Sequence, residues 1–221
     1  GILGSFTPSI RALAVGRDGR VYAGGSFDEA GGSPVKNLAV WDGSVWAPLG
    51  EGVDNVGEVA RATVLSLAWA GSRLVVGGQF EQAGGFPAAG IAQWDGVRWL
   101  PMGAGVTRPG FLAQVDALAV RGHEVFAGGN FSEAGGVAAS GVARWDGTGW
   151  TPLGVGLEGR VSGLATFGGD LVAGGDFLRS GATNVAGLAR WNGTGWSGLG
   201  QGLGGNQPTV SAMAAGRTNL W

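Results

Sequence analysis

The sequence contains no cysteine and very few of the side chains that most often carry chemistry. Among its 221 residues there are one histidine, one tyrosine and two methionines. The absence of cysteine excludes disulfide bonds, thiolate metal sites and thiol nucleophiles. A serine–histidine–aspartate triad could use only His123. That residue falls in a polar segment between two apolar stretches, with no motif around it, and we predict that it is an exposed turn residue.

Charged residues are also scarce, and they form no basic run. They make up 14% of the chain, the formal net charge is −2, and Lys36 is the only lysine. Nucleic-acid binding, which depends on neutralising phosphates with basic side chains, is therefore not expected. No apolar run approaches the roughly 20 residues needed to span a bilayer, so no membrane span is expected. No segment keeps a helical period over about 11 residues, and long helices are not predicted.

Glycine and tryptophan are abundant, with 48 and 10 residues, and both recur at fixed positions. A Gly-Gly-x-Phe motif ends at Phe27, Phe80, Phe131 and Phe177. Each Phe is followed after 14 residues by one Trp and after 5 more by another: Trp41 and Trp46, Trp94 and Trp99, Trp145 and Trp150, Trp191 and Trp196. The motifs lie 53, 51 and 46 residues apart. Such periodic self-similarity predicts a repeat protein with a continuous core, in which most of these Trp side chains are buried.

One repeat is predicted to contain four short antiparallel strands, which we name a, b, c and d. In the third repeat these are residues 115–120, 125–129, 141–145 and 149–153, with a Gly/Ala-rich loop at 132–140 between b and c. Asp146-Gly147 is a tight-hairpin signal between c and d, so a structural role is predicted for this Asp and its counterparts. Tandem four-stranded units of this size predict an all-β fold, a β-propeller. A parallel β-helix has shorter repeats, and a β-sandwich would not repeat its sequence.

The repeats predict a single propeller domain over residues 1–221, with partial units at both ends. Full repeats are assigned to residues 10–54, 64–106, 115–157 and 161–203, and partial ones to 1–9 and 210–221. Residues 2–6 resemble the end of strand d at 48–52. We expect the chain to be a segment of a longer propeller protein. The alternative is that the two ends meet to build a fifth, incomplete blade.

The motifs resemble kelch-type propeller repeats. The segments Phe131–Gly136 and Val142–Gly154 are closest to the Gly-Gly-x-Phe-x-x-Ala-Gly-Gly and Trp-Asp-Gly-x-x-Trp-x-x-Leu-Gly pattern of bacterial surface proteins and of the fungal Rax2-type polarity marker. The resemblance implies an extracellular or cell-surface location. Related propellers include copper-radical oxidases and sialidases, which need Tyr and His metal ligands or a Tyr with an Arg cluster. Here Tyr22 aligns with the core position of Phe126, so no enzyme, metal or cofactor is expected.

Variable loops of repeat proteins tend to collect on one face, which is often the binding face. The longest d–a loops, residues 52–63 and 103–114, and the b–c loops are therefore predicted to form the recognition surface. The candidate contacts are Asp54, Arg61, Arg108, Phe111 and the acidic residues that follow the Phe motif, Asp28, Glu29, Glu81 and Glu133. The acidic set could instead bind cations, although solvated loops explain it more simply.

The function that we expect is a noncatalytic scaffold for a protein partner or a larger assembly. Two alternatives remain. One is a lectin-like propeller with similar glycan pockets between its blades. The other is a noncatalytic segment of a larger secreted enzyme. The d–a loops differ in every repeat, which favours one composite surface over several equivalent sugar sites.

Overall fold

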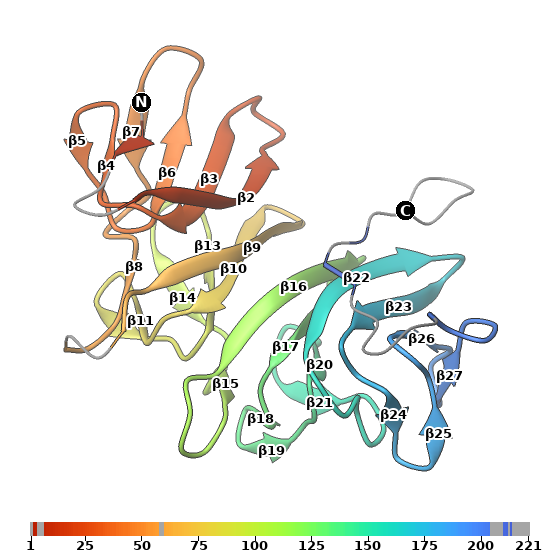
Figure 1. Ribbon diagram of the computed structural model, residues 1–221. Helices are drawn as coiled ribbons and strands as arrows, with labels where there is room; N and C mark the ends of the chain where they lie inside the picture. Colours follow the sequence, from red (N-terminus) through yellow and green to blue (C-terminus); the bar gives the residue numbers. More distant parts are fainter. Residues whose placement is uncertain (1, 4–6, 58–59, 204–209, 212, 214–221) are drawn as a thin grey trace. The chain divides into compact units, whose positions relative to one another are not determined.

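The computed structural model describes residues 2–3, 7–57, 60–203, 210–211 and 213. This part of the chain contains no helix and forms four antiparallel sheets of four strands each, in the predicted a–b–c–d order (Figure 1). Sheet 1 consists of β2 (Ser9–Val15), β3 (Val21–Ser26), β6 (Leu38–Trp41) and β7 (Trp46–Pro48). Sheet 2 consists of β9 (Thr63–Ala70), β10 (Arg73–Gln79), β13 (Ile91–Trp94) and β14 (Trp99–Pro101).

Sheets 3 and 4 repeat the same arrangement. Sheet 3 consists of β16 (Gln114–Arg121), β17 (Glu124–Asn130), β20 (Val142–Trp145) and β21 (Trp150–Pro152). Sheet 4 consists of β22 (Val161–Phe167), β23 (Asp170–Gly175), β26 (Leu188–Trp191) and β27 (Trp196–Gly198). The predicted four-stranded antiparallel units are therefore confirmed. Of a fifth strand a, predicted at 210–214, residues 212 and 214 lie outside the described residues, and the other three are not part of a strand.

The chain divides into two compact units, residues 1–105 with sheets 1 and 2, and residues 106–221 with sheets 3 and 4. Each unit has its own buried apolar cluster. In the first unit the cluster includes Leu38, Val64 and Leu74, and in the second it includes Phe126, Val161 and Leu171. Within a unit, the strand a side chains of one sheet pack against the strand b glycines of the sheet before it. A single propeller domain over 1–221 stays a prediction.

Each glycine of the Gly-Gly pair in strand b is required because another part of the chain comes very close to it. A Cβ atom on the first glycine, Gly128, would lie 2.6 Å from Cγ1 of Val161 on the next sheet. A Cβ atom on the second, Gly129, would lie 2.0 Å from the carbonyl oxygen of Gln114, where a β-bulge shifts the register between Val115 and Ala117. The first glycine lets two sheets pack closely, and the second accommodates the bulge.

The predicted b–c loop contains a small hairpin that the sequence analysis missed. In the third repeat β18 (Glu133–Ala134) pairs with β19 (Val137–Ala138) across Gly135-Gly136. The equivalent hairpins are β4 (Glu29–Ala30) with β5 (Ser33–Pro34), β11 (Gln82–Ala83) with β12 (Phe86–Pro87), and β24 (Arg179–Ser180) with β25 (Thr183–Asn184). In the first three repeats both central residues of the hairpin are glycines with positive φ, which is a signal for such tight hairpins.

Three of these hairpins gain a third strand, from the segment before sheet 1 in the first repeat and from the d–a connections in the second and third. These strands are β1 (Ile2–Leu3), β8 (Val53–Asp54) and β15 (Val106–Thr107). Ile2 pairs with Ala30 just as Val53 pairs with Ala83. The predicted match of residues 2–6 to the end of strand d is therefore wrong for Ile2 and Leu3, which correspond to residues 53 and 54. Residues 2–6 and 48–52 are short segments of similar sequence, and this similarity led to the wrong match.

The turns between strands c and d are longer than predicted. Trp145 and Trp150 are the last residues to pair across β20 and β21, so the loop contains four residues rather than the two of an Asp-Gly hairpin. The two indole rings contact each other across the strands, with their centroids 5.4 Å apart, and the other three repeats have equivalent Trp pairs. Both Trp145 and Trp150 are buried, as expected from the repeat.

Candidate functional site

Three of the predicted contact residues line one cavity in the first unit. This cavity, of about 480 Å³, lies at the end of sheet 1 where the b–c and d–a loops meet, and we call it the charged cavity. It is lined by Phe27, Asp28, Val35, Lys36, Asn37, Asp54, Gly57, Ala60, Arg61 and Ala62. The structure therefore brings Asp28, Asp54 and Arg61 together at one cavity. The sequence predicted only that they lie on the same face.

Asn37, in the lining of the charged cavity, distinguishes the first repeat from the others. Asn37 has a φ of 63°, and its carbonyl accepts a hydrogen bond from the Gly25 N–H, a role that the Gly90 and Gly141 carbonyls take in the next two repeats. Asparagine tolerates this left-handed conformation better than most residues. The Asn37 side chain accepts a hydrogen bond from the Phe27 N–H at 3.2 Å and donates one to the Val53 carbonyl at 3.0 Å. Its amide thereby fixes the b–c loop of sheet 1 to the following d–a connection.

Lys36 and Asp54 form an ion pair across the charged cavity, at 2.9 Å between Nζ and Oδ2. Their side chains are 59% and 47% exposed. Exposed pairs of this kind contribute little to stability, because water and salt screen the charges. Both charges can therefore exchange partners at small cost. The backbone of Asp54 is held in place, since its carbonyl accepts a hydrogen bond from Glu81 at 3.0 Å.

The remaining predicted contact residues do not gather at one site. Glu29 lies on β4, and the Glu81 carboxylate accepts a hydrogen bond from the Val56 N–H at 2.7 Å. In the second unit, Glu133 accepts a hydrogen bond from the Thr107 hydroxyl, and the Arg108 guanidinium lies 4.6 Å from the centre of the exposed Phe111 ring. Over the described ranges, no group of three or more His, Cys, Asp or Glu residues could hold a metal ion.

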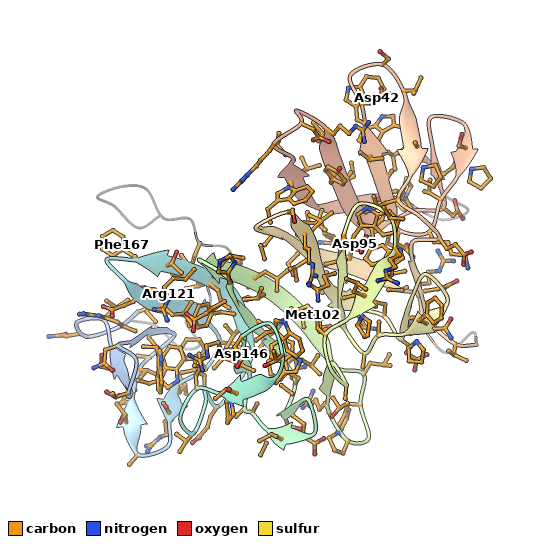
Figure 2. The ribbon with its side chains drawn as sticks, turned by 180° about the vertical axis from the view of Figure 1, so that it is seen from behind. Asp42, Asp95, Met102, Arg121, Asp146 and Phe167 are labelled. Atoms are coloured by element: carbon orange, nitrogen blue, oxygen red, sulfur yellow. The ribbon has the colours of Figure 1, made fainter. Side chains whose placement is uncertain are left out.

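The repeated Asp residues of the c–d turns act within the turns themselves. Asp42, Asp95 and Asp146, labelled in Figure 2, each accept backbone hydrogen bonds from the residues two and three positions later. The Gly149 and Thr148 N–H groups and the Thr148 hydroxyl lower the pKa of Asp146 to about 2. Backbone donors lower the pKa of Asp42 and Asp95 in the same way. These hydrogen bonds give each of the three carboxylates a structural role in its own turn.

The residues considered for enzyme chemistry lie in ordinary structural positions. His123 is exposed in the turn between β16 and β17, as predicted. Tyr22 is buried on β3 with its ring edge against Trp69, and burial raises the pKa of its hydroxyl. No helix in the described part of the chain is long and apolar enough to cross a membrane.

A second cavity in the first unit was not predicted. It has a volume of about 460 Å³ and lies mainly at the opposite end of the strands, by the a–b and c–d turns. Tyr22, Trp69 and Trp94 form much of its wall. The signal in the sequence was Trp69, which falls outside the repeated Trp pairs and stands where other repeats have Val15, Val120 or Thr166.

Comparison with solved structures finds a likeness to a crystal structure of the computationally designed Ika4 protein. The match covers 78% of this chain and 88% of the designed one, with 18% sequence identity and a TM-score of 0.43. That degree of likeness supports no statement about function. No protein-family model and no curated protein matches the sequence.

Proposed function

We propose that this chain is a noncatalytic β-propeller module that binds a protein partner at the charged cavity. The observation that carries the proposal is the convergence of Lys36, Asp54 and Arg61 around an apolar floor that includes Phe27 and Val35. Charges of both signs around an apolar centre are typical of protein recognition surfaces, where the rim sets orientation and the centre supplies affinity.

The local structure also suits recognition of an extended peptide segment. The backbone beneath the charged cavity is fixed by Asn37 and by strand pairing of β8 with β11, so it would be largely preorganised. The Lys36–Asp54 pair is exposed and easily exchanged for charges on a partner. Preorganised backbone with adaptable charged side chains lowers the entropic cost of binding.

The wider setting is part of the same proposal. The four sheets would be blades of a kelch-like propeller, five-bladed or part of a larger ring, in a bacterial protein that acts at the cell surface or outside the cell. Supporting this are the repeated four-stranded sheets and the close packing of strand a on the glycines of the sheet before it. A rigid repeat scaffold that carries variable loops on one edge fits a binding role better than a catalytic one.

The test is a selection of random displayed peptides on the immobilised chain, followed by affinity measurement with purified peptides. We expect Lys36→Ala and Arg61→Ala each to weaken binding about tenfold, as a loss of about 1.4 kcal/mol would do. The matched control is Arg98→Ala, which removes a 76% exposed arginine from the c–d turn of sheet 2. It should leave affinity unchanged.

Two results would overturn the proposal. One is the absence of any selected peptide whose binding depends on Lys36 or Arg61. The other comes from a glycan array with stoichiometry measured on its hits. Several equivalent sugar sites per chain would identify the lectin-like alternative instead.

A further inference from the structure

The unpredicted cavity in the first unit has the composition of a ligand site. We call it the aromatic cavity, and it is lined by Arg17, Asp18, Arg20, Tyr22, Val40, Pro48, Leu49, Gly50, Trp69, Gly71, Ser72, Trp94 and Gly96. Its volume of about 460 Å³ lies within the usual range for small-molecule sites. Such sites combine apolar and aromatic walls with a few polar groups. It shares no residue with the charged cavity.

The aromatic cavity lies where the first repeat has a glycine and the third has an arginine. Gly16 and Arg121 are equivalent, since each directly follows the Val that pairs with the first apolar residue of strand b. In the second unit Arg121, labelled in Figure 2, lies 5.1 Å from the centre of the Phe126 ring and donates a hydrogen bond to the Gly169 carbonyl on the next sheet. Gly16 has no side chain to occupy the corresponding space.

The aromatic wall is also specific to this pair of sheets. Trp69 replaces the Val or Thr of the other repeats, and its ring contacts Tyr22 edge-on, with centroids 5.2 Å apart and planes at 83°. A Cβ atom on Gly16 would lie only 3.3 Å from the Trp69 ring, so the glycine makes room for the indole. The Trp69 Nε1 atom is buried and has no hydrogen-bond partner within the described residues. Trp94 adds a third aromatic ring to the wall.

The rim of the aromatic cavity carries a net positive charge. Its charged lining residues are Arg17, Arg20 and Asp18, and Oδ2 of Asp18 lies 3.6 Å from Nε of Arg20. Burial and the nearby Asp18 carboxylate raise the pKa of the Tyr22 hydroxyl. With one guanidinium engaged by Asp18, Arg17 is left as the cation most able to meet an anionic ligand.

We propose that the aromatic cavity binds an acidic sugar, a hexuronate unit of an oligosaccharide. The C–H face of a pyranose ring carries slight positive charge and complements the negative face of an indole. Sugar hydroxyls need both donors and acceptors, which Arg20, Ser72 and Asp18 supply, whereas a flat aromatic acid would need no acceptor. The sugar carboxylate would pair with Arg17 in a charge-assisted hydrogen bond. We expect one such site per chain, because Trp69 does not recur in the other repeats, and the site does not depend on the function proposed for the charged cavity.

The test is calorimetric titration of the full chain with trigalacturonate and with its fully methyl-esterified, neutral form. We expect the acid to bind with a stoichiometry of one and the ester about tenfold more weakly. Trp69→Val, which installs the residue of two other repeats, should abolish measurable binding. Arg17→Gln should weaken binding of the acid about tenfold and leave the ester unaffected. Arg98→Gln, an exposed arginine outside the cavity, is the matched control and should have no effect.

Three outcomes would overturn the inference: neither sugar binds, acid and ester bind equally, or binding of the acid survives in both variants. Because Trp69→Val removes buried surface, its fold is checked by circular dichroism and thermal unfolding. If that variant fails to fold, the comparison of acid with ester and of Arg17→Gln with Arg98→Gln still decides the matter. Neither comparison requires a change in the core.

Discussion

The carboxylate of Asp146 is held by its turn rather than directed at a ligand, and this predicts a specific pH dependence. Its folded pKa is about 2, below the roughly 3.9 of an unfolded Asp. The stabilisation is therefore present above about pH 4 and is lost as the pH falls through the folded pKa. In Asp146→Asn, denaturant unfolding measured between pH 2 and 6 should show a shallower loss of stability at low pH than in the wild type.

The fourth repeat supplies a natural control for that prediction. Asn192 occupies the same turn position and accepts hydrogen bonds from the Thr194 and Gly195 N–H groups, both at 3.0 Å. An uncharged amide can therefore cap this turn. Asp146→Asn should retain most of the stability at neutral pH, and Asp146→Ala should retain less. Equal stability of Asp146→Ala and the wild type at neutral pH would show that the carboxylate does not hold the turn.

Two glycines of the third repeat should respond very differently to substitution by alanine. A Cβ atom on Gly129 would lie 2.0 Å from the Gln114 carbonyl oxygen, and backbone atoms of a bulged strand cannot move aside easily. Gly149 has no atom within 4 Å of the equivalent position. Gly129→Ala should cost about 3 kcal/mol of unfolding free energy, and Gly149→Ala should stay within about 0.5 kcal/mol. Urea denaturation measures both.

Equivalent leucines on the first strands of different sheets differ greatly in how far they are buried. Leu164 on β22 is 6% exposed and lies close to Gly128 of the sheet before it, whereas the equivalent Leu13 on β2 is 62% exposed. Leu164→Ala should therefore cost about 2–5 kcal/mol, and Leu13→Ala less than about 0.5 kcal/mol. The free energies of unfolding are compared at low protein concentration. An equally large loss for Leu13→Ala would mean that this face of β2 is covered in solution.

The strands could be predicted from the sequence because their signals are local and repeated. The pairing of Trp145 with Trp150 follows from a spacing that never varies. A Gly-Gly pair, Gly128-Gly129 in the third repeat, marks the end of strand b in every repeat. The b–c hairpins were missed because each strand has only two residues, too few for an alternating pattern to be visible. Ile2 was misaligned for the same reason.

The cavities could be anticipated only in part, because they depend on packing between elements distant in sequence. Asp54 and Arg61 were proposed from loop length, and the structure places them with Lys36, which nothing in the sequence had marked. The Trp69 wall of the aromatic cavity depends on the absence of a side chain at Gly16, because a Cβ atom there would crowd the indole. That absence becomes informative only once the register shows that Arg121 fills the equivalent space.

The two compact units differ in whether they contain the candidate cavities. Both candidate cavities are lined only by residues before position 105, within the first compact unit. The largest buried cluster of each unit is also made of residues from that unit alone. In repeat proteins, stability is approximately the sum of the repeats and their nearest-neighbour interfaces. The first unit should therefore fold and bind without the second.

A fragment of residues 1–105 tests this directly. We expect a cooperative urea transition with an m value about half that of the full chain, because m scales with the surface exposed on unfolding. Trigalacturonate should bind the fragment within about threefold of its affinity for the full chain, which is less than 1 kcal/mol. A fragment of residues 106–221 should not bind it. If the first fragment unfolds without cooperativity, sheets 1 and 2 need the rest of the chain for stability. If instead it folds but fails to bind, while the full chain binds, then part of the sugar site lies beyond residue 105.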